Sequence, residues 1–477
     1  MSNFQLNGVD PQKCFIIHKQ DIEKRLDPFY YIPSIIELEN KVRALNSKPL
    51  RYYVKHISSG ATPKTTEAEK YYSDAEHGVP FLRVQNLSPT GELELDECKY
   101  INWETHENYL KRSQVSGGDL LIKITGVGRM AVASVAPEGF IGNTNQHMVV
   151  IKTESKEVSE ILAAYLNTDM GEALASRRAT GGTRPALDYP ALLSIPIVYD
   201  KKILEIHREA IKIKKEKEAE AKALLESIDT YLLNELGIEL PKIENDLDKR
   251  IFTVNFSEIS AKRLDPDYYS SYYRKLENAI NSSCSPVEIS SIVSLIKGGK
   301  TPAKDDYSDK RTDFPIVKVG SYTKDFIDLD KVDYVIKPTG IPIHKNDIFI
   351  LSAAHQSEYV GKHIKFLNIE PEKNTSYVGE LICIRTIKEQ CNPMYLFSLL
   401  NLDIFKTLLN REKTGQTSHI YGKDIKKIKI PLPDIDMQND IAKHIENLRK
   451  KAEQLQNEAL ETLQNAKLEV ENIILGE

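Results

Sequence analysis

The sequence predicts an α+β protein made of two similar halves, each a globular domain followed by a long helix. Three observations support this fold class. Short motifs recur in the same order in both halves, β-rich runs alternate with turn residues between them, and each half ends in a long stretch without proline. Of the 477 residues, 41% are hydrophobic and 28% are charged, which is typical of folded protein and argues against a wholly disordered chain.

The strongest match between the halves is an eight-residue segment. Residues 24–31 read Lys-Arg-Leu-Asp-Pro-Phe-Tyr-Tyr and residues 262–269 read Lys-Arg-Leu-Asp-Pro-Asp-Tyr-Tyr, so seven of eight positions agree. We expect these segments to fix a turn and to pack aromatic side chains between the halves or against a partner. Shorter matches follow in the same order: Gly-x-Thr-Pro at 60–63 and 299–302, Thr-Gly-x-Thr at 180–183 and 414–417, and Ile-Pro at 195–196 and 430–431.

Each half is predicted to end in a long helix, over about 201–236 and about 437–475. Gly237 and Gly476 follow the predicted ends, and glycine is a common helix stop. In the second helix, apolar residues alternate spacings of four and three from Ile441 to Ala459, as in a coiled-coil seam. Because each helix follows its own domain, we expect the two to pair as an antiparallel coiled coil. The alternative is two unrelated surface helices.

These patterns divide the chain into four segments. The first domain with its N-terminal segment is expected in 1–199, with a core over 48–199, and the first long helix in 200–240. The second domain is expected in 241–434, with a core over 284–434, and the second long helix in 435–477. Each domain is also expected to hold one shorter helical stretch, over about 158–177 and about 393–411.

No recognisable catalytic constellation is present. Residues 27–30 approach the Asp-Pro-Pro-Tyr motif of amino-methyltransferases, but the second proline is missing. Residues 298–301 read like the end of a phosphate-binding loop, but Pro302 obstructs the helix that should follow. Neither His-Glu-x-x-His nor Cys-x-x-Cys occurs. We therefore expect no catalytic residue, no bound metal and no cofactor. An enzyme with an unrecognised site is the alternative.

Composition also indicates where the protein works. Five scattered cysteines without Cys-x-x-Cys spacing suggest the reducing cytosol rather than a disulfide framework. No apolar stretch approaches the roughly 20 residues that span a bilayer, and the N-terminus lacks a secretory pattern. We thus expect a cytoplasmic protein with no membrane partner. The net charge of −5 excludes a chain that is basic all over, but not one with basic faces.

The architecture resembles the specificity subunit of type I restriction–modification enzymes. The resemblance rests on the two variable domains, each with a similar long helix, and on the Gly-x-Thr-Pro and Thr-Gly-x-Thr motifs. It implies two target-recognition domains that read a bipartite double-stranded DNA target, one half-site each, without catalysis by the chain itself. It also implies two copies of an adenine methyltransferase subunit and a motor–endonuclease subunit as partners. The alternatives are a related two-part methyltransferase complex, or a coiled-coil interaction scaffold with two peptide- or protein-binding domains.

DNA binding needs cations on one face and polar side chains that reach base edges. Between Ile404 and Ile430 there are seven Lys or Arg residues against two acids. We therefore expect the residues that contact DNA to lie near the repeated motifs. In the first domain they are Arg83, Gln85, Asn86, Arg129, Asn143, Asn145, Gln146, Arg177, Arg178, Thr183 and Arg184. In the second domain they are Lys318, Ser321, Tyr322, His355, Gln356, Lys413, Gln416, Thr417, Ser418 and His419.

Overall fold

The computed structural model describes residues 10, 12–23, 25–242, 251–256, 259, 263–415 and 418–476. Two candidate DNA contacts, Gln416 and Thr417, lie outside the described residues. The chain divides into two compact units, Met1–Ala219 with Leu455–Glu477, and Glu220–Gln454. Each unit includes part of both long helices, whereas the sequence predicted each long helix as a separate segment. The mixed helix and strand content confirms the predicted α+β class.

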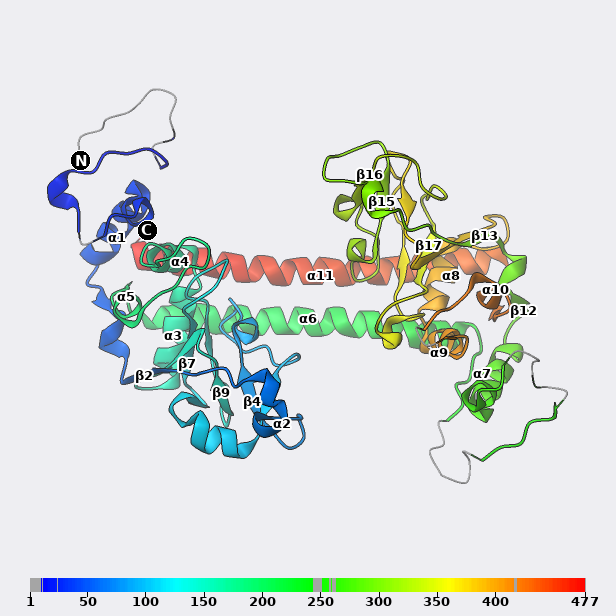
Figure 1. Ribbon diagram of the computed structural model, residues 1–477, viewed down its shortest axis with the longest axis horizontal. Helices are drawn as coiled ribbons and strands as arrows, with labels where there is room; N and C mark the ends of the chain where they lie inside the picture. The colour runs from blue at the N-terminus through cyan, green and yellow to red at the C-terminus, as the bar shows by residue number, and fades with distance from the viewer. Residues whose placement is uncertain are drawn as a thin grey trace. The chain divides into compact units, whose positions relative to one another are not determined.

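The first unit contains two sheets and a two-stranded ribbon (Figure 1). The first sheet is antiparallel and has the order β2 (His56–Ser59), β10 (Met148–Lys152), β7 (Leu120–Lys123), β8 (Ala133–Val135). The second sheet has the order β3 (Tyr72–Ser73), β5 (Lys99–Ile101), β4 (Val79–Leu82), β9 (Ile141–Thr144), β6 (Gln114–Ser116), and β4 and β9 run parallel. The ribbon pairs β1 (Lys48–Pro49) with β11 (Pro196–Ile197).

The second unit repeats this topology except that its described residues form no strand equivalent to β6. Its antiparallel sheet has the order β13 (Val293–Gly298), β20 (Leu381–Thr386), β17 (Ile348–Leu351), β18 (Ile364–Phe366). Its other sheet has the order β14 (Tyr307–Ser308), β16 (Asp333–Val335), β15 (Pro315–Val317), β19 (Ser376–Tyr377), again with one parallel pair, β15 and β19. The ribbon pairs β12 (Pro286–Glu288) with β21 (Lys429–Pro431). The shared strand order and direction confirm that the two halves use one fold.

The shorter helical stretch of each domain is two helices rather than the predicted one. They are α3 (Lys156–Leu166) and α4 (Asp169–Ser176) in the first half, and α8 (Pro393–Leu400) and α9 (Asp403–Arg411) in the second. In the first half Thr168 causes the break, because its hydroxyl accepts the Gly171 N–H at 2.9 Å and donates to the Tyr165 carbonyl at 2.8 Å. The remaining short helices are α1 (Pro33–Ala44), α2 (Ala68–Tyr71), α5 (Tyr189–Leu193), α7 (Ser271–Asn281) and α10 (Gly422–Ile425).

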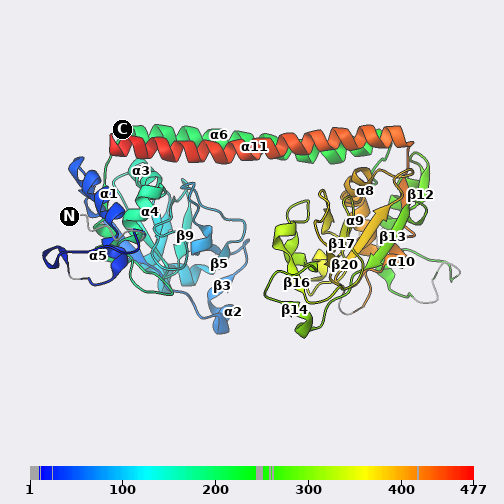
Figure 2. The same ribbon diagram turned by 90° about the horizontal axis from the view of Figure 1, so that it is seen from above.

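The two long helices, α6 (Lys201–Glu235) and α11 (Ile435–Leu475), lie side by side within each unit (Figures 1 and 2). In the first unit His207 adjoins Ala466, and Lys217 pairs with Glu458. In the second unit Glu220 pairs with Lys451 at 3.8 Å, and the Tyr231 and His444 rings are 4.3 Å apart.

Residue numbers rise along one helix as they fall along the other, so the antiparallel pairing is confirmed within each unit. The predicted seam is buried at five positions, Ile441, Ile445, Ala452, Leu455 and Ala459. Among the described residues, no helix combines the length and the apolar character needed to cross a membrane.

Candidate nucleic-acid interface

The Thr-Gly motif of the first half forms a loop, residues 180–186, which we call the first Thr-Gly loop. Thr180 and Ala186 exchange both backbone N–H···O bonds at 2.8 Å, so the loop closes as a hairpin. The Leu187 N–H donates to the Ile124 carbonyl just beyond β7 at 2.8 Å. Gly181 has a φ of +98°, a conformation that favours glycine. The motif therefore fixes a hairpin against the end of a buried strand.

The second half builds the same frame at residues 414–419, the second Thr-Gly loop. Thr414 and His419 exchange backbone hydrogen bonds at 2.9 and 3.0 Å. The Ile420 N–H donates at 2.9 Å to the carbonyl of Ser352, which directly follows β17. Gly415 has a φ of +86°. Both halves thus pair the two ends of the loop through the same backbone bonds, next to equivalent strands.

The Gly-x-Thr-Pro motif brings a second segment to the first loop region. A side chain at Gly60 would lie 1.6 Å from the Thr144 carbonyl oxygen, so only glycine allows this close approach. The motif's Thr62 hydroxyl then donates to the Gln146 side-chain oxygen at 2.6 Å. In the second half, a side chain at Gly299 would likewise lie 2.2 Å from a backbone oxygen, that of Val378.

Several predicted DNA contacts are exposed on or near these loops. In the first half Gln146, Thr183 and Arg184 are exposed, and burial together with the Arg184 charge lowers the pKa of His147. The remaining exposed candidates are Gln85 in the first half, and His355 and Gln356 after β17. They supply exposed hydrogen-bonding side chains, of which Gln146 is also bonded to Thr62, and the kinds of side chain differ between the halves.

Two half-buried candidates of the second half are bonded to their neighbours. The Lys413 ammonium donates to the Ser357 carbonyl at 2.7 Å, and the Ser418 and Ser357 hydroxyls lie 2.5 Å apart. The His419 ring is stacked near Tyr421 at 6.3 Å. These contacts tie the second Thr-Gly loop to the segment that follows β17.

Positive charge gathers beside the second Thr-Gly loop. Burial and the charges of Lys365, Lys406 and Lys362 lower the pKa of His363. Burial and the Lys362 charge also lower the pKa of Lys413. Sequence reasoning missed Lys362 and Lys365, because the folded chain brings them to α9 from a distant segment.

Several candidates are buried and support the scaffold, so the expectation that they contact DNA is wrong. Asn86 and Ser321, 1% and 0% exposed, occupy equivalent turns. Asn86 accepts the Arg83 N–H at 2.9 Å and Ser321 accepts the Lys318 N–H at 3.2 Å. The buried side chain of Asn143 donates to the Leu110 carbonyl at 2.9 Å.

The predicted DNA contacts of Asn145 and Tyr322 are wrong for the same reason. Asn145 is buried and accepts the His147 N–H at 3.0 Å, which fixes its own turn. The Tyr322 ring packs against an apolar core, and its buried hydroxyl has no hydrogen-bond partner among the described residues. Neither side chain offers a group to a ligand at the surface.

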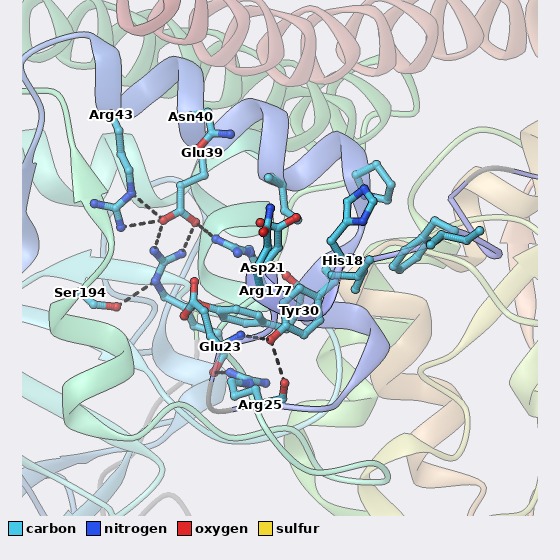
Figure 3. Close-up of a pocket in the computed structure, with 18 of the residues that line it drawn as sticks. His18, Asp21, Glu23, Arg25, Tyr30, Glu39, Asn40, Arg43, Arg177 and Ser194 are labelled. Carbon is cyan, nitrogen blue, oxygen red and sulfur yellow. Dashed lines mark hydrogen bonds and ion pairs between the residues drawn. The ribbon is translucent and has the colours of Figure 1, made fainter. Parts of the chain in front are cut away.

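Arg177 and Arg178 also fail as DNA contacts. They are 8% and 5% exposed, and both bind the carboxylate of Glu39 in α1 (Figure 3). The sequence could not show this, because Glu39 lies far from them along the chain.

Three further cationic candidates are only partly exposed. Arg129 donates to Asp169 at 2.8 Å and to the Asn167 carbonyl at 2.7 Å, beside the start of α4. Lys318 pairs with Asp333. Arg83 donates to the Glu97 carbonyl at 3.2 Å. Any role of these three side chains in DNA contact stays a prediction. Within the described part of the chain, no three His, Cys, Asp or Glu side chains are grouped so as to hold a metal ion.

Comparison with known proteins points to one family. Residues 281–465 match the family model described as type I restriction modification DNA specificity domain. The chain is 28% identical over 164 residues to a Methanocaldococcus jannaschii protein named as the MjaX specificity subunit of a type I restriction enzyme. That match covers 33% of this chain and 37% of the relative, so it spans well under half of either protein.

Solved structures of similar chains cover more of the sequence at lower identity. A type I restriction–modification S subunit from M. genitalium is 14% identical, with 90% of this chain and 95% of that chain covered and a TM-score of 0.38. A chain from a structure concerned with complex assembly and conformational transition of the type I R-M system is 14% identical, with 90% and 96% covered and a TM-score of 0.46.

Proposed function

We propose that this chain, which belongs to the type I restriction–modification DNA specificity family, is the sequence-specificity subunit of a restriction–modification complex. Each domain reads one half of a bipartite double-stranded DNA target. The chain catalyses no reaction itself. It recruits two copies of an adenine methyltransferase subunit and a motor–endonuclease subunit. It works in the cytoplasm, where its five free cysteines stay reduced.

The duplicated Thr-Gly loop is the observation that carries this proposal. Both loops share their backbone hydrogen bonds and a glycine with positive φ, while the exposed side chains around them differ. Arg184 in the first half suits the acceptor atoms of guanine, and Gln146 suits adenine. His355 and Gln356 offer a different set of groups in the second half. A shared frame with different polar side chains is what two half-sites of different sequence require.

Local charge supports DNA rather than a peptide as the ligand of the second domain. Lys362, Lys406 and Lys413 lie near one another and near the second Thr-Gly loop, whereas the nearby Lys365 is buried and donates to the Lys324 carbonyl. Such a group of cations suits the phosphate backbone, which supplies much of the affinity of proteins for DNA. The overall charge of −5 then matters little, because the binding face carries the opposite sign.

The test is the salt dependence of DNA binding by the chain co-purified with its methyltransferase subunit. We expect affinity for duplex DNA to fall steeply between about 50 and 200 mM salt. Replacing the exposed Lys362 by alanine should reduce the slope of log affinity against log salt by about 1. The matched control is Lys443→Ala, an exposed lysine on α11, which should leave the slope unchanged. A scaffold that binds peptides would show no such slope with DNA.

A further inference from the structure

One arginine of the repeated Arg-Leu-Asp-Pro segment reaches the base of the first Thr-Gly loop. Arg25 donates from its two terminal nitrogens to the carbonyls of Arg178 and Ala179, both at 2.8 Å. Figure 3 shows Arg25 among the residues that line a pocket next to α1. Ala179 directly precedes Thr180, the first residue of the loop. The guanidinium therefore holds the strand of chain that leads into the hairpin.

The second half makes a similar contact, from a single nitrogen of Arg263. Arg263 donates to the carbonyls of Arg411 and Lys413 at 2.7 and 2.8 Å. Lys413 directly precedes Thr414, where the second Thr-Gly loop begins. The arginine side chains are 22% and 17% exposed, so both contacts are largely shielded from water. In each half an arginine thus donates to the carbonyl that directly precedes the loop, although the other loop side chains differ.

The rest of the repeated segment holds the arginine in place. Asp27 accepts a bond from the Arg25 Nε at 2.8 Å and also accepts the Tyr30 N–H at 3.2 Å, which caps the turn at Pro28–Tyr31. The Tyr31 hydroxyl donates to the Arg25 carbonyl at 2.8 Å. The Tyr30 ring lies 4.6 Å from the Arg25 guanidinium.

In the second half Asp265, Tyr268 and Tyr269 make the equivalent contacts around Arg263. Asp265 accepts from the Arg263 Nε at 2.8 Å, the Tyr269 hydroxyl donates to the Arg263 carbonyl at 3.0 Å, and the Tyr268 ring lies 4.1 Å from the guanidinium. The expected turn is confirmed in both halves. The aromatic side chains, which were expected to pack between the halves or against a partner, pack on arginines of their own half instead. The shared Asp-Pro-x-Tyr-Tyr pattern therefore serves the orientation of one arginine in each half.

We propose that Arg25 and Arg263 are positioning residues that set the pose of the two Thr-Gly loops for DNA reading, one arginine per half-site. This inference rests on the proposed function for its DNA part. The arginines bind the loops through backbone carbonyls, so they determine where the reading side chains point without contacting a base. A charge-assisted contact to two carbonyls at once suits this task, because it restricts both the distance and the angle of the held segment. The shared arginine also allows the loop side chains to vary freely.

The first experiment measures the loops without DNA, in the full chain with its methyltransferase subunit. Hydrogen–deuterium exchange is followed in peptides covering residues 178–188 and 412–421. Arg25→Ala should accelerate exchange about tenfold in the first peptide and leave the second unchanged, and Arg263→Ala should do the reverse. Arg25→Lys keeps the charge but loses the two-pronged bond, so it should accelerate exchange in a protein that still folds. The matched control is Leu26→Ala, since the neighbouring Leu26 is 84% exposed.

The second experiment measures discrimination between DNA half-sites, on a target identified from the methylated sites of the wild-type complex. Arg25→Lys should lower discrimination at one half-site about tenfold and leave the other half-site as in the wild type. Unchanged loop exchange, or equal losses at both half-sites, would overturn the positioning role. If the wild-type complex shows no sequence preference at all, the proposed function fails. In that case the hydrogen–deuterium exchange of the loop peptides still decides whether the arginines hold the loops.

Discussion

The Arg178 guanidinium donates to both carboxylate oxygens of Glu39, with N–O distances of 2.6 and 3.0 Å. Arg177 and Arg43 also bind this carboxylate, so three guanidinium groups surround one acid. The equivalent region of the second half has a different set of acidic and basic side chains. Glu277 pairs with Arg411 at 2.5 Å, and Glu412 occupies the position after Arg411, as Arg178 does after Arg177. The equivalent regions of the two halves therefore respond differently to substitution and to pH.

Removing the Glu39 charge should destabilise the first unit strongly. Glu39→Gln leaves buried guanidinium groups without their counter-charge, which typically costs about 3–5 kcal/mol. The measurement is urea denaturation, with protection of first-unit amides as the signal. Glu37→Gln is the matched control, because Glu37 lies exposed on the same helix and should change stability by less than about 0.5 kcal/mol. A Glu39→Gln variant as stable as this control would disprove the structural role.

The same carboxylate predicts how acid affects the first unit. Burial alone would raise the pKa of Glu39, but the bonds and charges of Arg178, Arg177 and Arg43 outweigh it and lower the pKa from 4.5 to about 2. A lowered acid pKa stabilises the fold above pH 4.5, and this stabilisation is lost as the pH falls from 4.5 towards 2. The loss should be about 3 kcal/mol. Unfolding measured across this window should show a shallower acid decline in Glu39→Gln than in the wild type.

Glu412 predicts the opposite pH dependence in the second unit. Burial raises the pKa of Glu412 above 4.5, against the opposing charges of Arg411 and Arg263. An acid with a raised pKa binds its proton more readily in the folded state, so stability should increase as the pH falls from 7 towards 4.5. Glu412→Gln should flatten this dependence. The stability of the second unit is measured from hydrogen exchange of its buried amides at pH 7 and pH 5, corrected for intrinsic rates. An equal change of stability with pH in the wild type and in Glu412→Gln would refute this prediction.

The seam between the long helices should be sensitive to truncation. Ile445 is fully buried against α6 and the second domain, so Ile445→Ala should cost about 2–5 kcal/mol. Leu460 lies on the same helix but is 62% exposed, and Leu460→Ala should be nearly neutral. Thermal denaturation of the two variants compares them directly. Similar melting temperatures would mean that the seam contributes little to stability.

Features carried by local sequence could be predicted well. Identity between the halves predicted one fold used twice, and the absence of proline and glycine predicted both long helices to within two residues at each end. The break between α3 and α4 had a local signal that was overlooked, because Asn167-Thr168-Asp169 contains a typical helix cap.

Features set by distant contacts could not be predicted. Arg177 looks the same in sequence whether it faces DNA or a buried acid, and its partner Glu39 lies 138 residues away. Asn143 is polar, yet it occupies a strand whose neighbours bury it completely. Lys362 joins the basic group beside the second Thr-Gly loop only through folding. The role of Arg25 was hidden for the same reason, since its acceptors lie 153 and 154 residues away.

The most direct test of the proposed function exchanges one domain and maps the methylated DNA. Residues 48–199 are replaced by the equivalent region of a homologue, and the chimera is produced with its methyltransferase subunit in cells whose DNA is then sequenced for methylated adenines. We predict a bipartite motif in which one half changes while the other half stays as in the wild type. A simultaneous change in both halves, or a motif unaltered by the exchange, would contradict one half-site per domain.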